Sequence, residues 1–252
     1  MNLKKIIVTL LAVAVLSMGL FACANVDDSS VELPAEPVIE QVTDKVFEGW
    51  GTFTGTLVDG KPSGEGALVA EDFTYVGTFE AGFQITGSGT KTYANGQVSK
   101  GQFVNGALHG WGTHDYNNGC IGMGQWVNGG MNGTMWFTWG QVGGPYEVYI
   151  GEWKDGKRFD DDAFYTFNNG CWYRGEFDDW INGEGEFHWT NGNYFKGTFA
   201  GGNPVKGKVG YGQMDGVQGY ILPDAETGAW GWFTGTLEDG TEVVNGQPVV
   251  AE

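Results

Sequence analysis

The residues that could act in catalysis or hold a cofactor are few and scattered in this sequence. The three histidines, His109, His114 and His188, have no partner at the spacing of a zinc site. No glycine pair is completed to the G-x-G-x-x-G pattern of dinucleotide binding, and no G-x-S-x-G motif presents a nucleophilic serine. The sequence therefore predicts a protein that is not an enzyme and carries no cofactor.

One run of acidic side chains could offer oxygen ligands to a cation. Asp160, Asp161 and Asp162 are consecutive, and we expect Asp178-Asp179 at the same sheet edge one hairpin later. Calcium takes several oxygen ligands of this kind. Such a run is more often a solvated acidic loop, so a calcium site is the weaker of the two interpretations.

A glycine-aromatic repeat must position these side chains. Numbered from Ser99 as position 0, its template has glycines at +2, +7, +11 and +13 and aromatic residues at +4 and +17. The spacing recurs from Phe53 to Phe199 and returns from Phe233 to Gly240, whereas residues 203–228 match it poorly. With 45 glycines and 15% aromatic residues, the composition favours an all-β repeat protein.

The template has different residue types on the two faces of a strand. Positions 0, +2 and +4 are aromatic, glycine and aromatic, whereas +1 and +3 are mostly polar. Glycine leaves room for a ring to lie flat on the backbone. Asn-Gly and Asp-Gly pairs at both ends of each hairpin, such as Asn105-Gly106 and Asn118-Gly119, predict type I′ turns. We expect an elongated single-layer antiparallel meander of about eight β-hairpins.

The spacing Y-x-G-x-F-x-x-G-x-x-x-G-x-G resembles the MORN repeat. The resemblance covers Phe53 to about Gly202 and again Phe233 to Gly240. It implies that the hairpins stack into one long, twisted sheet. It also implies a scaffold or assembly platform without catalysis, and some members of the family contact phospholipid.

Four tryptophans depart from the template: Trp111, Trp136, Trp172 and Trp180. Parity places the first three on the polar face, while Trp180 occupies a turn glycine position. Exposed aromatic residues often mark surfaces that recognise a protein or a carbohydrate. The alternative interpretation is that isolated tryptophans shield a sheet that has no second layer, and the sequence favours neither.

Cys120 and Cys171 belong to copies two repeats apart in this arrangement. Four strand spacings separate them by roughly 19 Å, well beyond the reach of a disulfide. We expect two free thiols.

The first residues resemble a bacterial lipoprotein signal. Lys4 and Lys5 precede a largely apolar run that ends at Ala22-Cys23. Acylation of Cys23 is favoured over ordinary cleavage after Ala24, because a cysteine at the end of the apolar run has no other evident use. The expected organisation is a signal peptide over residues 1–22, an acidic flexible tether over 23–46 and a sheet domain over 47–252. The protein would be anchored by lipid on the extracytoplasmic side of a bacterial membrane.

The charge of the chain excludes several partners. Its net charge is −18, and the two lysines lost with the signal leave the mature chain more acidic. Nucleic-acid binding requires clustered basic residues, which are missing here. Anionic phospholipid is disfavoured for the same reason. The leading prediction is a surface-anchored scaffold that binds a protein partner; the alternatives are a glycan or cell-wall binding module and, less favoured, a module that contacts phospholipid.

Overall fold

The structure, a computed structural model, describes residues 36–80, 82–140 and 144–250. The predicted signal peptide, Cys23 and the first part of the predicted tether lie outside these residues. Pro37–Glu252 form one compact unit. The described part of this unit contains no helix that could cross a membrane.

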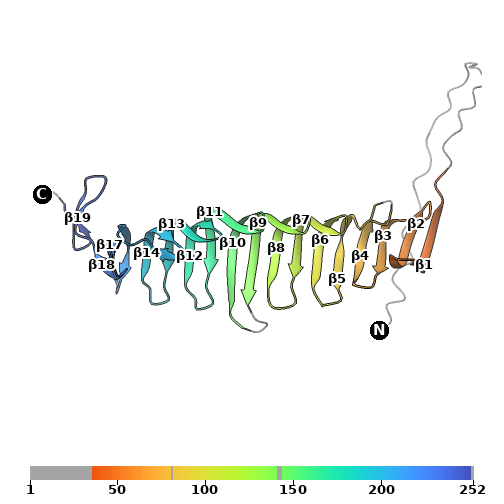
Figure 1. Cartoon of the computed structure of the whole chain (residues 1–252), viewed down its shortest axis with the longest axis horizontal. Helices are drawn as coiled ribbons and strands as arrows, with labels where there is room; N and C mark the ends of the chain where they lie inside the picture. The colour runs from red at the N-terminus through yellow and green to blue at the C-terminus, as the bar shows by residue number, and fades with distance from the viewer. Residues whose placement is uncertain (1–35, 81, 141–143, 251–252) are drawn as a thin grey trace, which may run out of the picture. The chain divides into compact units, whose positions relative to one another are not determined.

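The described residues form β-strands joined by short turns (Figure 1). The first nine strands are β1 (Ile39–Phe47), β2 (Gly51–Val58), β3 (Lys61–Val69), β4 (Phe73–Phe79), β5 (Gly87–Tyr93), β6 (Val98–Val104), β7 (Ala107–Asp115), β8 (Ile121–Val127) and β9 (Gly130–Gly140). The next nine are β10 (Tyr146–Lys154), β11 (Lys157–Thr166), β12 (Trp172–Asp178), β13 (Trp180–His188), β14 (Tyr194–Ala200), β15 (Asn203–Pro204), β16 (Gly210–Met214), β17 (Val217–Pro223) and β18 (Trp230–Trp232). A small second sheet follows, with β19 (Gly235–Thr236), β20 (Glu242–Val244) and β21 (Gln247–Pro248).

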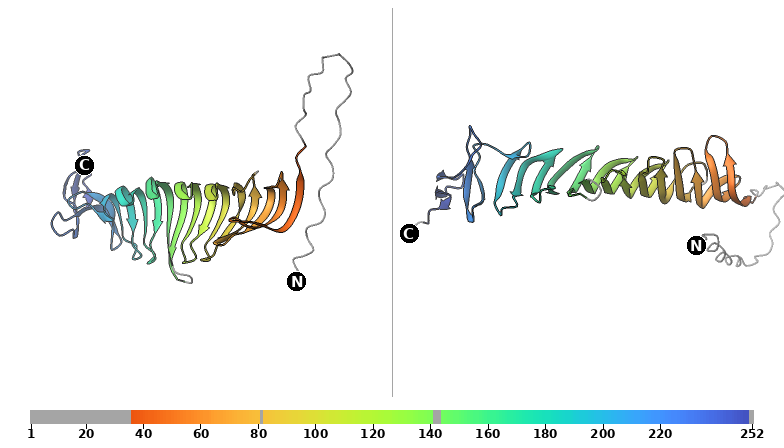
Figure 2. Two further views of the ribbon diagram at one scale, coloured as in Figure 1. Left: turned by 45° about the vertical axis from the view of Figure 1, so that its right-hand side comes forward. Right: turned by 90° about the horizontal axis from the view of Figure 1, so that it is seen from below.

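The large sheet is a meander in which each strand pairs antiparallel with the next. This order holds from β1 to β14, after which β14 pairs with both β15 and β16. The row ends with β17 and β18. Both views of Figure 2 show the strands following one another in a single row. The predicted all-β, single-layer meander is confirmed.

Two segments depart from the predicted organisation. Strand β1 takes in residues 39–46 of the expected flexible tether, so that prediction is wrong for this part. The strand pairs along its length with β2, and Val42 and Phe47 pack at the margin of the core, which the acidic composition concealed. Residues 203–228, which match the template poorly, continue the meander through the β16–β17 hairpin.

One face of the sheet is a continuous layer of buried rings. The ring of Tyr75 meets that of Phe79 in its own hairpin edge to face at 5.2 Å and that of Phe103 in the next hairpin at 5.4 Å. Tyr173 repeats this arrangement with Phe177 and Phe199. Each such contact adds about 0.5–1.5 kcal/mol to the free energy of burial. The rings therefore connect each hairpin to its neighbour.

The template glycines at +2 and +13 alternate in register across seven strands. The pairs run without interruption from β2 to β8 and join Gly55, Gly66, Gly77, Gly89, Gly101, Gly112 and Gly124. A Cβ atom on Gly89 would lie 2.5 Å from the Cζ atom of Tyr75. The ring does lie directly on bare backbone, as the pattern predicts.

The turns at the two edges of the sheet are of different types. At one edge both central residues have positive φ, for example 51° for Asn105 and 80° for Gly106, which is the predicted type I′ geometry. At the other edge only the glycine of most pairs is left-handed, as at Gly170. There the Gly170 amide bonds to the Phe167 carbonyl, and the Cys171 amide bonds to the Asn169 side chain.

This second turn is a three-residue loop in which the asparagine side chain satisfies a backbone amide. The prediction of type I′ turns at this edge is therefore wrong. Asn-Gly fits both turn types, and the number of loop residues selects between them.

Candidate interaction surface

The face opposite the rings carries the side chains at positions +1 and +3, which are exposed or half-buried. Because the strands are in register, these side chains form rows that cross the sheet. One row runs from β2 to β16 through Thr54, Ala67, Val76, Thr90, Lys100, Thr113, Met123, Trp136, Ile150, Phe164, Arg174, Glu186, Lys196 and Tyr211. We call it the outer row.

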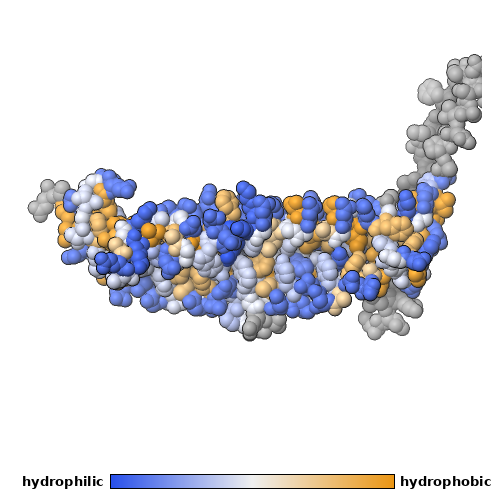
Figure 3. Space-filling view, viewed as in Figure 1, coloured by the Kyte–Doolittle hydropathy of each residue, from blue (hydrophilic) through white to orange (hydrophobic). Residues whose placement is uncertain are grey.

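The centre of the outer row is apolar and exposed. Met123, Trp136 and Ile150 are direct cross-strand neighbours on β8, β9 and β10, and they are 46%, 48% and 41% exposed. The row becomes charged on both sides, at Lys100 and at Arg174. We refer to Met123, Trp136 and Ile150 as the central patch. Figure 3 shows one face of the molecule, on which apolar residues lie in several separate places among hydrophilic ones.

Trp111 and Trp136 lie on the face that parity predicts. Trp111 is 59% exposed on β7 and is paired with Gln125 on β8. Met123 and Ile150 were not singled out by sequence reasoning, although both occupy position +1 of their copies. An apolar residue at a position that is otherwise polar was the signal that could have identified them.

Trp172 lies on the same face, but its ring is stacked on that of His188. The two ring centroids are 3.7 Å apart and the planes differ by 11°. The His188 ring in turn stacks on Tyr194 at 5.0 Å, and its Nε2 atom contacts the Glu186 carboxylate. These residues form a cross-strand stack that stabilises β12 to β14, so the indole of Trp172 is in part covered.

Trp180 does not belong to the exposed set. Its indole packs against the core, 5.5 Å from the Tyr165 ring, and the Arg158 guanidinium lies 4.9 Å from its centroid. The expectation of an exposed partner contact is wrong for this residue. In the Asp179-Trp180 turn, only Asp179 has a positive φ. Trp180 stands where the template has a glycine, and its side chain packs on the buried rings.

The acidic run is engaged in contacts within the protein. The Asp160 carboxylate accepts hydrogen bonds from the backbone amides of Glu152 and Asp162, both at 2.8 Å. Asp162 forms a bidentate ion pair with Arg174, which lowers the pKa of the Asp162 carboxyl. No group of three or more potential metal ligands occurs among the described residues. The calcium interpretation of Asp160, Asp161 and Asp162 gains no support.

His114 contacts a template position that lacks a ring, and the two described cysteines are unpaired. Ser99 occupies a position where other copies carry a ring, and its hydroxyl is 2.7 Å from the Nδ1 atom of His114, whose imidazole fills part of that space. Burial lowers the pKa of His114, which keeps the ring neutral at neutral pH. Cys120 and Cys171 are free thiols, as predicted.

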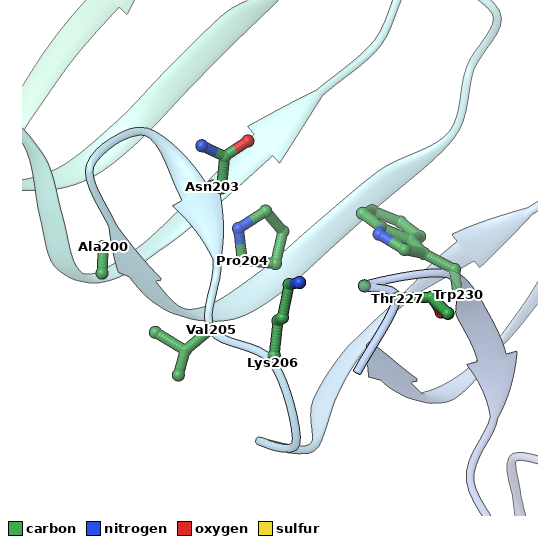
Figure 4. Close-up of a pocket in the computed structure, with 8 residues that line it drawn as sticks. Ala200, Asn203, Pro204, Val205, Lys206, Thr227 and Trp230 are labelled. Atoms are coloured by element: carbon green, nitrogen blue, oxygen red, sulfur yellow. The ribbon is translucent and has the colours of Figure 1, made fainter. Parts of the chain in front are cut away.

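The described surface also has shallow hollows. One hollow of about 470 Å³ lies where the repeat is degenerate, and Figure 4 shows Pro204, Lys206 and Trp230 around it. Its only ammonium group, on Lys206, is already bonded to the Glu226 carbonyl at 2.9 Å. A second hollow of about 430 Å³ lies on the outer face beside Trp111.

Comparison with known proteins agrees with the geometry. The family model described as MORN repeat matches residues 75–98, 100–121, 149–159 and 169–194. No curated protein matches the chain. The matched segments fall on the hairpins β4–β5, β6–β7 and β12–β13 and on the first part of β10–β11. In these four segments, the chain carries MORN repeats.

Proposed function

We propose that this protein is a non-catalytic repeat scaffold that docks a protein partner on its central patch. The observation that supports the proposal is the row Met123, Trp136 and Ile150, an exposed and uncharged stretch in the middle of an acidic chain. Contiguous apolar surface of this kind marks interaction sites in soluble proteins. Tryptophan is also among the residue types enriched at the hot spots of protein interfaces.

The sheet holds this patch in a fixed geometry. Three side chains on adjacent strands are spaced by the hydrogen-bond ladder, and the buried rings on the opposite face fix the strands themselves. Binding to such a surface orders few side chains, which keeps the entropic cost of docking low. Acidic and basic groups at the ends of the outer row would set the orientation of the partner.

The proposed location is the cell envelope, with Cys23 acylated and the residues before β1 as the connection to the lipid. The lipobox-like sequence Leu20 to Cys23 supports this proposal. Mass spectrometry of the mature N-terminus tests it. An acylated Cys23 is the expected result, and an unmodified N-terminus at Asn25 would contradict it.

In-cell photo-crosslinking tests the docking proposal. A photoreactive amino acid at Met123 should give an adduct with one protein partner, whereas the same probe at Lys196 should not. Lys196 is exposed in the same row, six strands further along the sheet than Met123, and so controls for general accessibility.

The variant Ile150→Lys should abolish the Met123 adduct and leave the fold unchanged, because the side chain is exposed. Equal adducts at both probe positions would refute the proposal. So would an adduct that forms only between copies of this chain.

A further inference from the structure

A groove crosses the strands of the outer face next to the central patch. Its floor is the backbone of Gly77, Gly89 and Gly101, which are in register on β4, β5 and β6. Side chains of the flanking positions form the two walls, and the groove has a volume of about 430 Å³. The lining side chains are Glu65, Val76, Ser88, Thr90, Lys100, Gln102 and Trp111.

The groove is long in one direction, so the ligand that fits it best is an extended molecule. The walls follow two cross-strand rows, so the groove runs along the long axis of the sheet rather than along a strand. From β3 to β7 this is four strand spacings, roughly 19 Å. A linear chain of several units lying across the strands fits this shape.

The floor of the groove argues against a peptide that binds by adding a strand to the sheet. Peptides that add to a sheet bind its edge, where backbone amides and carbonyls are unpaired. Here the backbone groups of Gly77, Gly89 and Gly101 belong to strands that are paired on both sides. Recognition must therefore come from the side chains of the walls.

Those side chains suit a neutral sugar polymer. Trp111 offers a large, exposed aromatic surface on which the apolar face of a pyranose ring can stack. Gln102 has an amide, and Ser88 and Thr90 have hydroxyl groups, which both donate and accept hydrogen bonds.

The charges of the groove favour an uncharged ligand. Glu65 and Lys100, on opposite walls, leave the lining with no formal net charge, and the Thr78 hydroxyl already donates to the Glu65 carboxylate at 3.1 Å. The remainder of the protein is strongly acidic and repels polyanions. We propose that the groove beside Trp111 binds a neutral, extended polysaccharide. This site is separate from the central patch and does not depend on the protein partner proposed above.

Isothermal titration of the purified chain with cellohexaose and chitohexaose tests the proposal. At least one of the two should bind, and Trp111→Ala should weaken it by about tenfold or more, the effect expected for an aromatic anchor. Trp111→Phe retains an aromatic ring and should lose less affinity for the sugar than Trp111→Ala. Because Trp111 is largely exposed, Trp111→Ala should have the same melting temperature as the native chain.

Trp136→Ala is the matched control, since it removes an indole of similar exposure outside the groove. It should leave sugar binding unchanged. The proposal is overturned if neither sugar binds, if Trp136→Ala lowers the affinity as much as Trp111→Ala, or if polygalacturonate, an anionic polymer, binds more tightly than both neutral sugars. If the Met123 probe gave no adduct in cells with the otherwise native chain while the sugar still bound, only the docking of a protein partner would be refuted.

Discussion

Tyr75 shows what a single ring requires from its neighbours in this sheet. Its side chain is fully buried, although the protein has only one layer of strands. The ring lies over Gly89, and the hydroxyl donates to the carbonyls of Thr78 and Ser88 at 3.1 and 3.2 Å. Burial raises the pKa of Tyr75 to about 12, so the hydroxyl stays protonated and keeps donating at physiological pH.

Substitution of the glycine beneath this ring should be costly. In Gly89→Ala the new methyl group would lie 2.5 Å from the Cζ and Oη atoms of Tyr75, and the backbone of Gly89 is otherwise compatible with alanine. Overpacking of this kind lowers the free energy of unfolding by about 1–3 kcal/mol. The midpoint of urea denaturation measures the effect.

Gly231→Ala provides the control, because its added methyl group would meet open space and its φ is not in the left-handed region. This variant should unfold within a few tenths of a kcal/mol of the native chain. Equal midpoints for the two variants would show that the ring of Tyr75 is not held against the backbone.

At the scale of the hairpin, the sequence predicts the template strands more accurately than the turns that join them. Parity identified the buried face, because aromatic residues and glycines alternate in a way that only one face can accommodate. It could not identify β1, whose sequence lacks the template and whose pairing depends on the neighbouring strand β2. The sequence also could not predict the turn type at one edge of the sheet, because Asn-Gly occurs in both two-residue and three-residue loops.

The same limit applies to the candidate surface. Trp111 and Trp136 could be placed on the outer face from their positions in the repeat. Other neighbours can be identified only from the register of several consecutive strands. Met123 and Ile150 flank Trp136 in this register, and Glu65 and Trp111 line the same groove. Cross-strand neighbours are set by pairing, which local patterns do not encode.

Type I′ turns make a specific prediction for the edge that contains Asn105. The residue has a φ of 51°, a conformation that costs an alanine about 1–2 kcal/mol. Asn105→Ala should therefore lower the free energy of unfolding by about that amount, whereas Asn105→Gly should change it little. Chemical denaturation of the two variants in parallel measures the difference, and identical midpoints would contradict the left-handed assignment.

At the scale of the whole sheet, strand pairing joins each hairpin only to its neighbours. Ring contacts such as Tyr149 with Phe177 and Tyr173 with Phe199 join successive copies, and no pairing among the described strands links distant ones. Stability in such an array is approximately a sum of the intrinsic stabilities and the contacts between adjacent units. A substitution that destabilises one hairpin should then affect only that hairpin and its neighbours.

Tyr173→Ala tests this locality. The side chain is fully buried between the Phe177 and Phe199 rings, and its removal leaves a cavity that should cost about 3–5 kcal/mol. Hydrogen exchange measured by mass spectrometry should show faster exchange in β11 to β14 and unchanged protection in β2 to β5. The exposed-site variant Trp111→Ala should alter neither region. If exchange instead accelerated equally along the whole sheet, unfolding would be a single cooperative event, and the rings would couple all the hairpins rather than successive pairs.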